Sequence, residues 1–411
     1  MSVLRRAPFA ARSSRRLITG ALALGAVAVL VSGCADFSSA AAPTTWSPAP
    51  NLAPEAGPNP QLPGESGGAG GSSGQGSGQN GDQQNPASVP PPQGCKDFHQ
   101  EVIATCLGPV AAVALLPGTE SNPVALAAQR TSGTIVRVQA GQQPQTVANL
   151  SVDSSADGGL TGLALSPSYA TDQLIFAYIT TPTDNRIVRI APGDTPKPIL
   201  TGIPRGSTDN RGELALDHKG ALLVATGDAG NPQAAKDPNS LAGKVLRIDV
   251  NGQPAPGNPN PSSTIVASGL TDPGGVCSSA DGSRAWVTDR TTTQDVLYKL
   301  NVGQPLGTAA WTWPDKPGVA GCVSFPNSVM VATSTAGNVQ SLSINADGSF
   351  AGSPQVALTG AAGYGRLGGL DLVGTTAAIA GTVNKDGGQP VSSDDRVVLI
   401  LGASSQGGGQ D

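Results

Sequence analysis

A unit of about 45–60 residues repeats along this chain, and the repeat strongly limits what the chain can fold into. Each unit holds a short apolar run, a second apolar run, a turn, and one or two further runs rich in Val, Ile and Leu. Runs of this length between turn residues are typical of β-strands. Repeated small sheets joined by tight turns predict the blades of a β-propeller.

Six such units fit the sequence without leftover segments. Their first strands are expected to begin near Val110, Leu160, Glu213, Gly275, Val319 and Leu367. The sixth unit lacks an outer strand at its C-terminal end, and Glu101–Leu107 can supply one from the other terminus. This closure matters because an open ring leaves a long strand edge unpaired. The sequence therefore predicts an all-β, six-bladed β-propeller over 94–403, closed by an N-terminal strand.

The composition agrees with many short strands and tight turns. Gly (55) and Pro (35) are frequent, and only 13% of the residues are charged. The net charge is −5, and the only charged residues in 1–33 are five arginines, so the rest of the chain carries −10. An acidic surface of this kind disfavours nucleic acid and anionic lipid as partners.

Residues 1–33 have the pattern of a lipoprotein signal peptide. A basic segment precedes the apolar run Leu17–Val31, which is short for a membrane span. Leu30-Val31-Ser32-Gly33-Cys34 then resembles the bacterial lipobox, in which Cys34 becomes the lipidated first residue. The alternative is cleavage after a small residue, with Cys34 an ordinary thiol. Lipidation of Cys34, with palmitate among the acyl chains, predicts an anchor on the outer face of the plasma membrane.

Two further segments are predicted to lack a fold of their own. Residues 34–93 are rich in Ala, Pro, Gly, Ser, Gln and Asn, which cannot bury enough apolar surface to fold. They are expected to form a disordered tether behind the lipidated cysteine. Residues 404–411, within the sequence SSQGGGQD, are expected to be a disordered tail.

Four cysteines follow Cys34, and an even number in an exported chain favours disulfides. Three pairings are possible. We favour Cys95–Cys106, which pins the start of the fold, and Cys277–Cys322, which ties the inner strands of neighbouring blades. A metal site is the rival interpretation, but the chain has no CxxC and only two histidines, His99 and His218.

The stretch Leu222–Gly252 carries the most specific resemblance in the chain. Its TGD, followed by DPNSLAGKVLRID, resembles the glucose/sorbosone dehydrogenase family, six-bladed propellers that use pyrroloquinoline quinone (PQQ). The resemblance runs from about Val102 to Ala403 and is densest between Gly158 and Gly275. Among narrower groups, TPTDNRIVRI, TGDAG and WTWPDKPGVAGC are similar to LppZ-type lipoproteins of mycobacteria and related actinobacteria.

The resemblance implies where the family's active-site groups fall in this sequence. The family uses a histidine base oriented by an aspartate, arginines that bind the quinone carboxylates, and calcium. Asp209 occupies the place of the histidine, and Asp228 keeps the place of the orienting aspartate, so these two are the candidate catalytic residues. Glu213 replaces an arginine, Asp272 lies in a segment that has lost its cofactor-binding Arg and Asn, and Arg366 keeps one of two expected arginines.

These replacements predict an acidic cup where the family has a cationic one. Asp209, Glu213, Asp228 and Asp272 are expected to converge on one end of the central channel. Like charges in such a cleft oppose an anionic cofactor. With Arg366, the acids are candidate ligand-binding groups for a cation or a polyol. The alternative is that they are strand-end carboxylates satisfied by backbone amides.

The sequence therefore favours a cell-envelope lipoprotein with a sugar-dehydrogenase-like propeller that binds a ligand or partner without catalysis. The ligand is expected to be an envelope glycan, a small polar molecule or a protein. No cofactor is expected on this interpretation. The alternative is a PQQ-dependent aldose dehydrogenase with a divergent active site, which requires PQQ and Ca²⁺.

Overall fold

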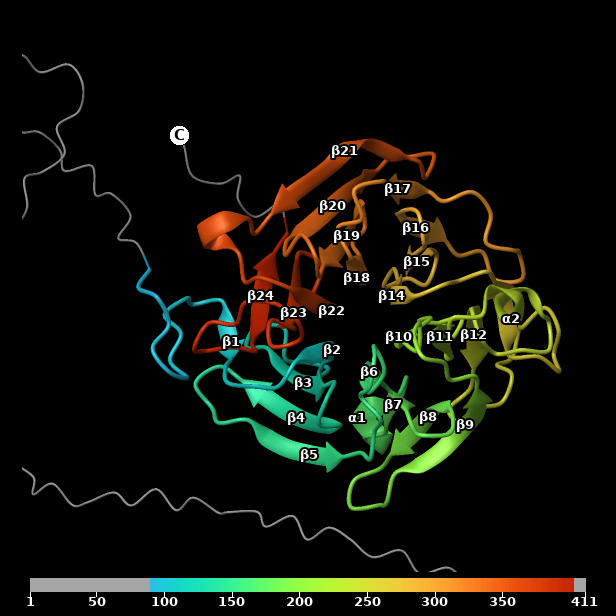
Figure 1. The fold of residues 1–411 in the computed structure, drawn as a ribbon, viewed down its shortest axis with the longest axis horizontal. Coiled ribbons are helices and arrows are strands. Elements are labelled where there is room, and N and C mark those ends of the chain that lie inside the picture. Colours follow the sequence, from blue (N-terminus) through green and yellow to red (C-terminus); the bar gives the residue numbers. More distant parts are fainter. Residues whose placement is uncertain (1–88, 403–411) are drawn as a thin grey trace, which may run out of the picture. The chain divides into compact units, whose positions relative to one another are not determined.

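The computed structural model describes residues 89–402, which form a ring of six four-stranded antiparallel sheets (Figure 1). Each sheet is one blade, and the first strands of all six blades line a common cavity at the ring axis. The predicted all-β, six-bladed propeller is confirmed. The predictions for 1–33 with Cys34, for most of 34–93, and for 404–411 lie outside the described residues.

The blades follow one another in chain order around the ring. The first three consist of β2 (Val110–Leu115), β3 (Val124–Gln129), β4 (Thr134–Gln139) and β5 (Gln145–Asn149), then β6 (Leu160–Leu165), β7 (Ile175–Thr180), β8 (Asn185–Ile190) and β9 (Lys197–Ile203), then β10 (Gly212–Leu216), β11 (Leu222–Thr226), β12 (Lys244–Ile248) and β13 (Ile265–Ser268). Blades four and five consist of β14 (Pro273–Ser278), β15 (Ala285–Arg290), β16 (Asp295–Lys299) and β17 (Trp311–Trp313), then β18 (Val319–Ser324), β19 (Ser328–Thr333), β20 (Val339–Ile344) and β21 (Phe350–Ala357). The sixth blade consists of β22 (Leu367–Val373), β23 (Ala377–Thr382), β24 (Val397–Leu401) and β1 (Val102–Ala104).

Helices are few and short in this part of the chain. They are α1 (Tyr169–Asp172), α2 (Pro232–Lys236) and the 3-10 helix η1 (Gly360–Ala362). None of the helices within 89–402 is long and apolar enough to cross a membrane.

The hydrophobic core lies between neighbouring blades, and β7 shows how the strands build it. Side chains alternate between the two faces of a strand. Phe176 and Tyr178 pack with strands of the third blade, whereas Ala177 and Ile179 pack with strands of the first. All six residues of β7 are buried, so this strand is apolar on both faces rather than alternately polar.

The first strands approach one another closely at the axis, and small residues permit this. A Cβ atom on Gly275 would lie 2.8 Å from the Cα atom of Gly321 in the next blade. A Cβ atom on Gly321 would in turn lie 2.3 Å from the backbone nitrogen of Leu370. Larger side chains at these positions would push the blades apart, so the diameter of the ring depends on them.

The N-terminal segment closes the sixth blade, as the sequence predicts. Strand β1 pairs with β24, with Val102 opposite Val398. Beside this pair, Leu107 and Asp395 exchange two backbone hydrogen bonds, because the N–H of each donates to the carbonyl of the other. The disulfide Cys95–Cys106 holds the same segment, and Cys277–Cys322 joins β14 to β18, so both predicted disulfides are present.

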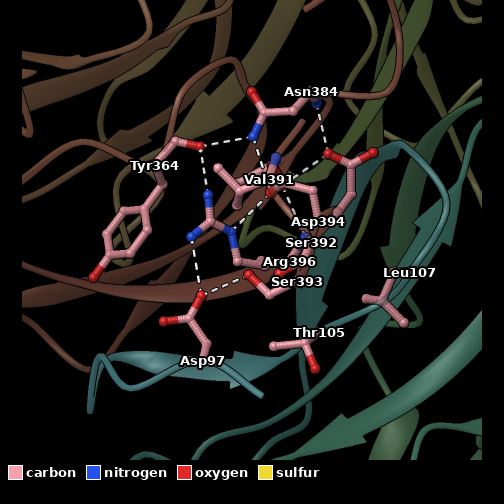
Figure 2. A network of polar contacts seen from close by, with 12 residues as sticks. Asp97, Thr105, Leu107, Tyr364, Asn384, Val391, Ser392, Ser393, Asp394 and Arg396 are labelled. Carbon is pink, nitrogen blue, oxygen red and sulfur yellow. Dashed lines mark hydrogen bonds and ion pairs between the residues drawn. The ribbon is translucent and has the colours of Figure 1, made fainter. Parts of the chain in front are cut away.

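Figure 2 shows a buried charge network that fastens this closure. The Arg396 guanidinium donates from Nε to Asp394 at 2.8 Å, from Nη1 to Asp97 at 3.1 Å, and from Nη2 to the Tyr364 carbonyl at 3.1 Å. Asp97 also accepts from the Ser393 hydroxyl. One cation therefore joins the N-terminal segment to the last blade, and the side chains of the three charged residues are at most 6% exposed.

Candidate functional site

Three aspartates meet at the end of the ring where the first strands of three blades begin. Asp157 precedes β6, Asp209 precedes β10, and Asp272 precedes β14. One carboxylate oxygen from each lies within 4.8 Å of the other two, so the group could hold a metal ion. The expected convergence of Asp209 and Asp272 is therefore seen. Asp157 was not predicted, because its loop (SADGG) has no motif that marks it as a site residue.

The loop that carries Asp209 is held in shape by its neighbour Asn210. The buried Asn210 amide donates to Asp157 at 3.2 Å, and its oxygen accepts from the Gly206 N–H at 2.8 Å. Asp209 itself has a left-handed backbone conformation, with φ of 55°. Gly227 packs against it so closely that a Cβ atom would lie 2.0 Å from the Asp209 carbonyl oxygen. The position of Asp209 is therefore fixed from two sides.

Asp228 lies beside this group but has partners of its own. Its carboxylate accepts from the Gly230 N–H at 2.8 Å, and its backbone N–H donates to the Thr271 carbonyl. It is 2% exposed, so little of it is open to a ligand. Asp228 thus caps the turn after β11, which is the structural role considered for it from the sequence.

Burial and like charges act together on these carboxyls. Burial raises the pKa of Asp209, and the charges of Asp228 and Asp157 raise it further. Burial likewise raises the pKa of Asp272, with Asp157 and Asp209 adding to the effect, although Arg290 opposes it. The ionised forms are therefore costly here, and a cation or hydroxyl donors that reached this site would relieve the cost.

Three arginines at the same end correct the prediction of a purely acidic cup. Arg290 forms an ion pair with Asp272 at 3.7 Å and donates from Nε to the Val319 carbonyl. Burial lowers the pKa of Arg290 to about 10, and the charges of Arg211 and Arg366 also lower it. The three arginines are therefore electrostatic neighbours. The cup is therefore mixed in charge. The family resemblance had marked Arg366, but not Arg211, which precedes β10, or Arg290, which ends β15.

Several polar atoms at this end lack a hydrogen-bond partner within the described residues. They are the buried Nε atoms of Arg211 and Arg366 and the buried Oδ1 atom of Asp272. Buried polar atoms are normally paired, so such atoms mark a place where a ligand or water can bind. The predicted ligand-binding residues Asp272 and Arg366 both belong to this set.

Glu213 does not join the aspartates, which corrects the expectation that all four acids converge. Its carboxylate accepts from the backbone N–H groups of Leu163 and Leu214 at 3.3 and 3.1 Å. It lines a cavity of about 680 Å³ in the channel, which none of Asp209, Asp228 and Asp272 lines. Burial raises the pKa of Glu213 to about 8. Glu213 lies inside β10, whereas Asp209 and Asp272 lie in the loops that precede their strands, so Glu213 is further along the channel.

Both histidines lie away from the position of the missing base. The imidazole of His99 packs edge-on against Tyr364, with ring centroids 5.7 Å apart. His218 follows β10 and lines the channel cavity. The position that the resemblance gives to a histidine base is therefore occupied by Asp209 alone.

The fold and this end of the channel define a class of protein: a six-bladed β-propeller with a polar, partly unpaired site where its first strands begin. Residues 112–313 match the sequence model of the Glucose / Sorbosone dehydrogenase family. This part of the chain is therefore similar to that family.

Solved structures show the same similarity. A PQQ-bound aldose sugar dehydrogenase from Streptomyces coelicolor is 28% identical, with a TM-score of 0.66, covering 76% of this chain and 99% of that one. A structure described as a glucose dehydrogenase, from Thermus thermophilus, is 26% identical, with a TM-score of 0.66 and coverages of 73% and 99%. The apo aldose sugar dehydrogenase of Escherichia coli, at 17% identity and a TM-score of 0.61, shares the fold over 73% of this chain and 99% of its own. No curated protein matches the chain.

Proposed function

We propose that this chain is a cell-envelope lipoprotein whose propeller binds a hydroxyl-rich ligand at the start of its first strands and does not oxidise it. The observation that carries the proposal is the group Asp157, Asp209 and Asp272 at the position where the family resemblance expects an imidazole base. Carboxylates and arginines side by side accept from and donate to sugar hydroxyls without any redox group.

The residues present do not fit PQQ chemistry. That chemistry needs a base free to take a hydroxyl proton and cations free to bind quinone carboxylates. Here the base position is one of three neighbouring carboxylates, and Arg290 is already paired with Asp272. A tricarboxylate cofactor would bring further negative charge to this group. No oxidation step therefore follows from this arrangement.

A second candidate, a PQQ-dependent aldose dehydrogenase with a divergent active site, is favoured by one specific observation. The Nε atoms of Arg211 and Arg366 are buried without hydrogen-bond partners in the described residues. Guanidinium groups of this kind bind carboxylates well. The Streptomyces coelicolor relative is named for its PQQ-bound form. In this candidate, Asp209 replaces histidine as the base and PQQ and Ca²⁺ are required.

The placement in the envelope rests on the sequence of the first 34 residues. The basic segment, the apolar run and Cys34 support export and lipidation, and the composition of 34–93 supports a tether. A propeller on such a tether reaches ligands on the wall side of the membrane. Envelope glycan fits the site, since it presents many hydroxyl groups.

Binding without oxidation is tested by saturation-transfer NMR on the full chain with glucose and with methyl glucoside, whose anomeric hydroxyl is blocked. We expect both sugars to bind, because recognition through the remaining hydroxyls does not require the free anomeric one. The double variant Asp209→Asn with Asp272→Asn should weaken the binding of both sugars by about tenfold, the effect of losing one or two charged hydrogen bonds.

The matched control is Asp194→Asn, which alters an exposed ion pair with Lys197 at the start of β9 and should leave sugar binding unchanged. The proposal is contradicted if neither sugar receives saturation from the protein, or if wild type and the double variant give equal saturation transfer. In that case, capture of an envelope protein that is insensitive to the double variant would assign binding to the outer rim.

A further inference from the structure

The channel contains a second candidate site, a cavity that is separate from the group formed by Asp157, Asp209 and Asp272. The cavity of about 680 Å³ is lined by the first strands of all six blades. It continues past the ends of those strands, where Pro117, Glu120 and His218 line it. Asp157, Asp209 and Asp272 instead precede the first strands of their blades. First strands of neighbouring blades run parallel, as the bridge from Ser279 to Ser324 shows, so the two sites open at opposite ends.

Most of the cavity lining is apolar, and this makes two of its carboxyl groups conspicuous, the buried Glu213 and the half-buried Asp371. Alanine, leucine, valine and proline supply more than half of the lining residues. Glu213 comes from the third blade and Asp371 from the sixth, which stand opposite each other in a ring of six. The charge of Asp371 nevertheless raises the pKa of Glu213, so the field of Asp371 reaches Glu213 across the channel.

Each carboxyl stands where the other five blades carry a small or apolar residue. Around the ring, the position of Glu213 is taken by Ala112, Gly162, Gly275, Gly321 and Gly369, and each of these glycines packs against the backbone of the next blade. Two residues further along each first strand, the position of Asp371 is taken by Ala114, Ala164, Ala215, Cys277 and Val323. The ring itself therefore does not require a carboxyl at either place.

Within residues 89–402, the cavity lining offers these acids no Lys or Arg, and its one basic side chain is His218 at the open end. Asp371 accepts from the backbone N–H groups of Leu115 and Leu372, at 2.7 and 2.8 Å. Arg211 acts on Glu213 from outside the cavity, and no Lys or Arg is among the described residues that line it. Glu120 adds a third acid at the open end. A cavity of this charge and polarity complements a cation with an apolar body.

We propose that the channel cavity is a binding site for a small organic amine, with its apolar body against the Leu and Val walls and its protonated nitrogen between Glu213 and Asp371. The volume lies within the range of about 300–1,000 Å³ that is typical of small-molecule sites. A protonated amine supplies a counter-charge that favours the ionised form of the two carboxyl groups, and it donates hydrogen bonds to their remaining acceptor positions. This site is independent of the hydroxyl-binding function proposed above.

The test is calorimetric titration of the full chain with phenethylamine, hexylamine and cyclohexylamine, each paired with its alcohol of the same carbon skeleton. We expect at least one amine to bind at least tenfold more tightly than its alcohol. The double variant Glu213→Gln with Asp371→Asn should reduce that amine's affinity by at least tenfold. Both replacements keep an oxygen that accepts the same backbone N–H groups.

Asp157→Asn at the opposite end serves as the control and should leave amine affinity unchanged. The proposal is overturned if no amine binds more tightly than its alcohol, or if the double variant binds it as wild type does. If the double variant does not fold, methyl NMR of the wild type decides the site. Amine-dependent changes in the methyl chemical shifts of Leu370 and Val323 support binding in the channel cavity. Changes confined to residues outside the cavity overturn the proposal.

Discussion

Replacing Arg396 by Met is expected to lower the free energy of unfolding by about 3–5 kcal/mol, the cost of leaving buried carboxylates without their cation. Asp97 and Asp394 both bond to this guanidinium, and their side chains are 2% and 1% exposed. Met preserves much of the apolar volume of the arginine stem, so the loss reports on charge rather than on a cavity. Chemical denaturation measures the change.

The result also tests how the ring is closed, because the network of Figure 2 joins the N-terminal segment to the last blade. The matched control is Lys197→Met, which removes an ion pair with both side chains more than half exposed and should leave stability unchanged. Equal stability of Arg396→Met and wild type would show that β1 and the disulfide Cys95–Cys106 close the ring without this network.

The second large effect is a dependence of stability on pH that belongs to Glu213. Its pKa is about 8 in the folded chain, against 4.5 in its ordinary state. Between these values the folded protein keeps a proton that the unfolded chain has released, so stability falls as pH rises from about 4.5 to 8 and then levels off. The loss due to this one group is at most about 5 kcal/mol.

Glu213→Gln should remove that part of the pH dependence, since Gln accepts from Leu163 and Leu214 and never ionises. The expected outcome is a variant that matches wild type at pH 5 and exceeds it by several kcal/mol at pH 8. Asp289, whose pKa burial also raises, contributes to both proteins and cancels in the difference. Parallel curves for wild type and variant from pH 5 to pH 8 would contradict this account of the channel.

The fold could be predicted from the sequence because each blade repeats the same local pattern. Apolar runs near Val110, Leu160 and Val319 begin strands at those residues, since turns and hydrophobic spacing fix short strands locally. The closing strand could be predicted by counting the strands of each blade, because the sixth blade has only three from its own segment and needs a fourth. Of three possible cysteine pairings, the favoured one is present: Cys95–Cys106 pins the start of the fold, and Cys277–Cys322 ties the first strands of neighbouring blades.

The candidate site was predictable only in part because it is assembled from loops and strand ends of different blades. The family resemblance marked Asp209, Asp228 and Asp272, which lie together, but it gave no position for Asp157 or Arg290. Arg290 ends β15, which pairs with β14 of the same blade, so its approach to Asp272 depends on the register of these two strands. The prediction that Glu213 joins the aspartates was wrong because Glu213 lies within β10, whereas Asp209 lies in the loop before that strand.

The most direct test of the central claim is to add PQQ and Ca²⁺ to the full chain and to follow quinone absorbance and aldose-dependent dye reduction. The Streptomyces coelicolor aldose sugar dehydrogenase, assayed alongside, provides the positive control. Our account predicts no spectral change and no turnover, because acids stand where the oxidation requires a free base. Tight PQQ binding with aldose-dependent dye reduction would contradict it and would establish the dehydrogenase instead.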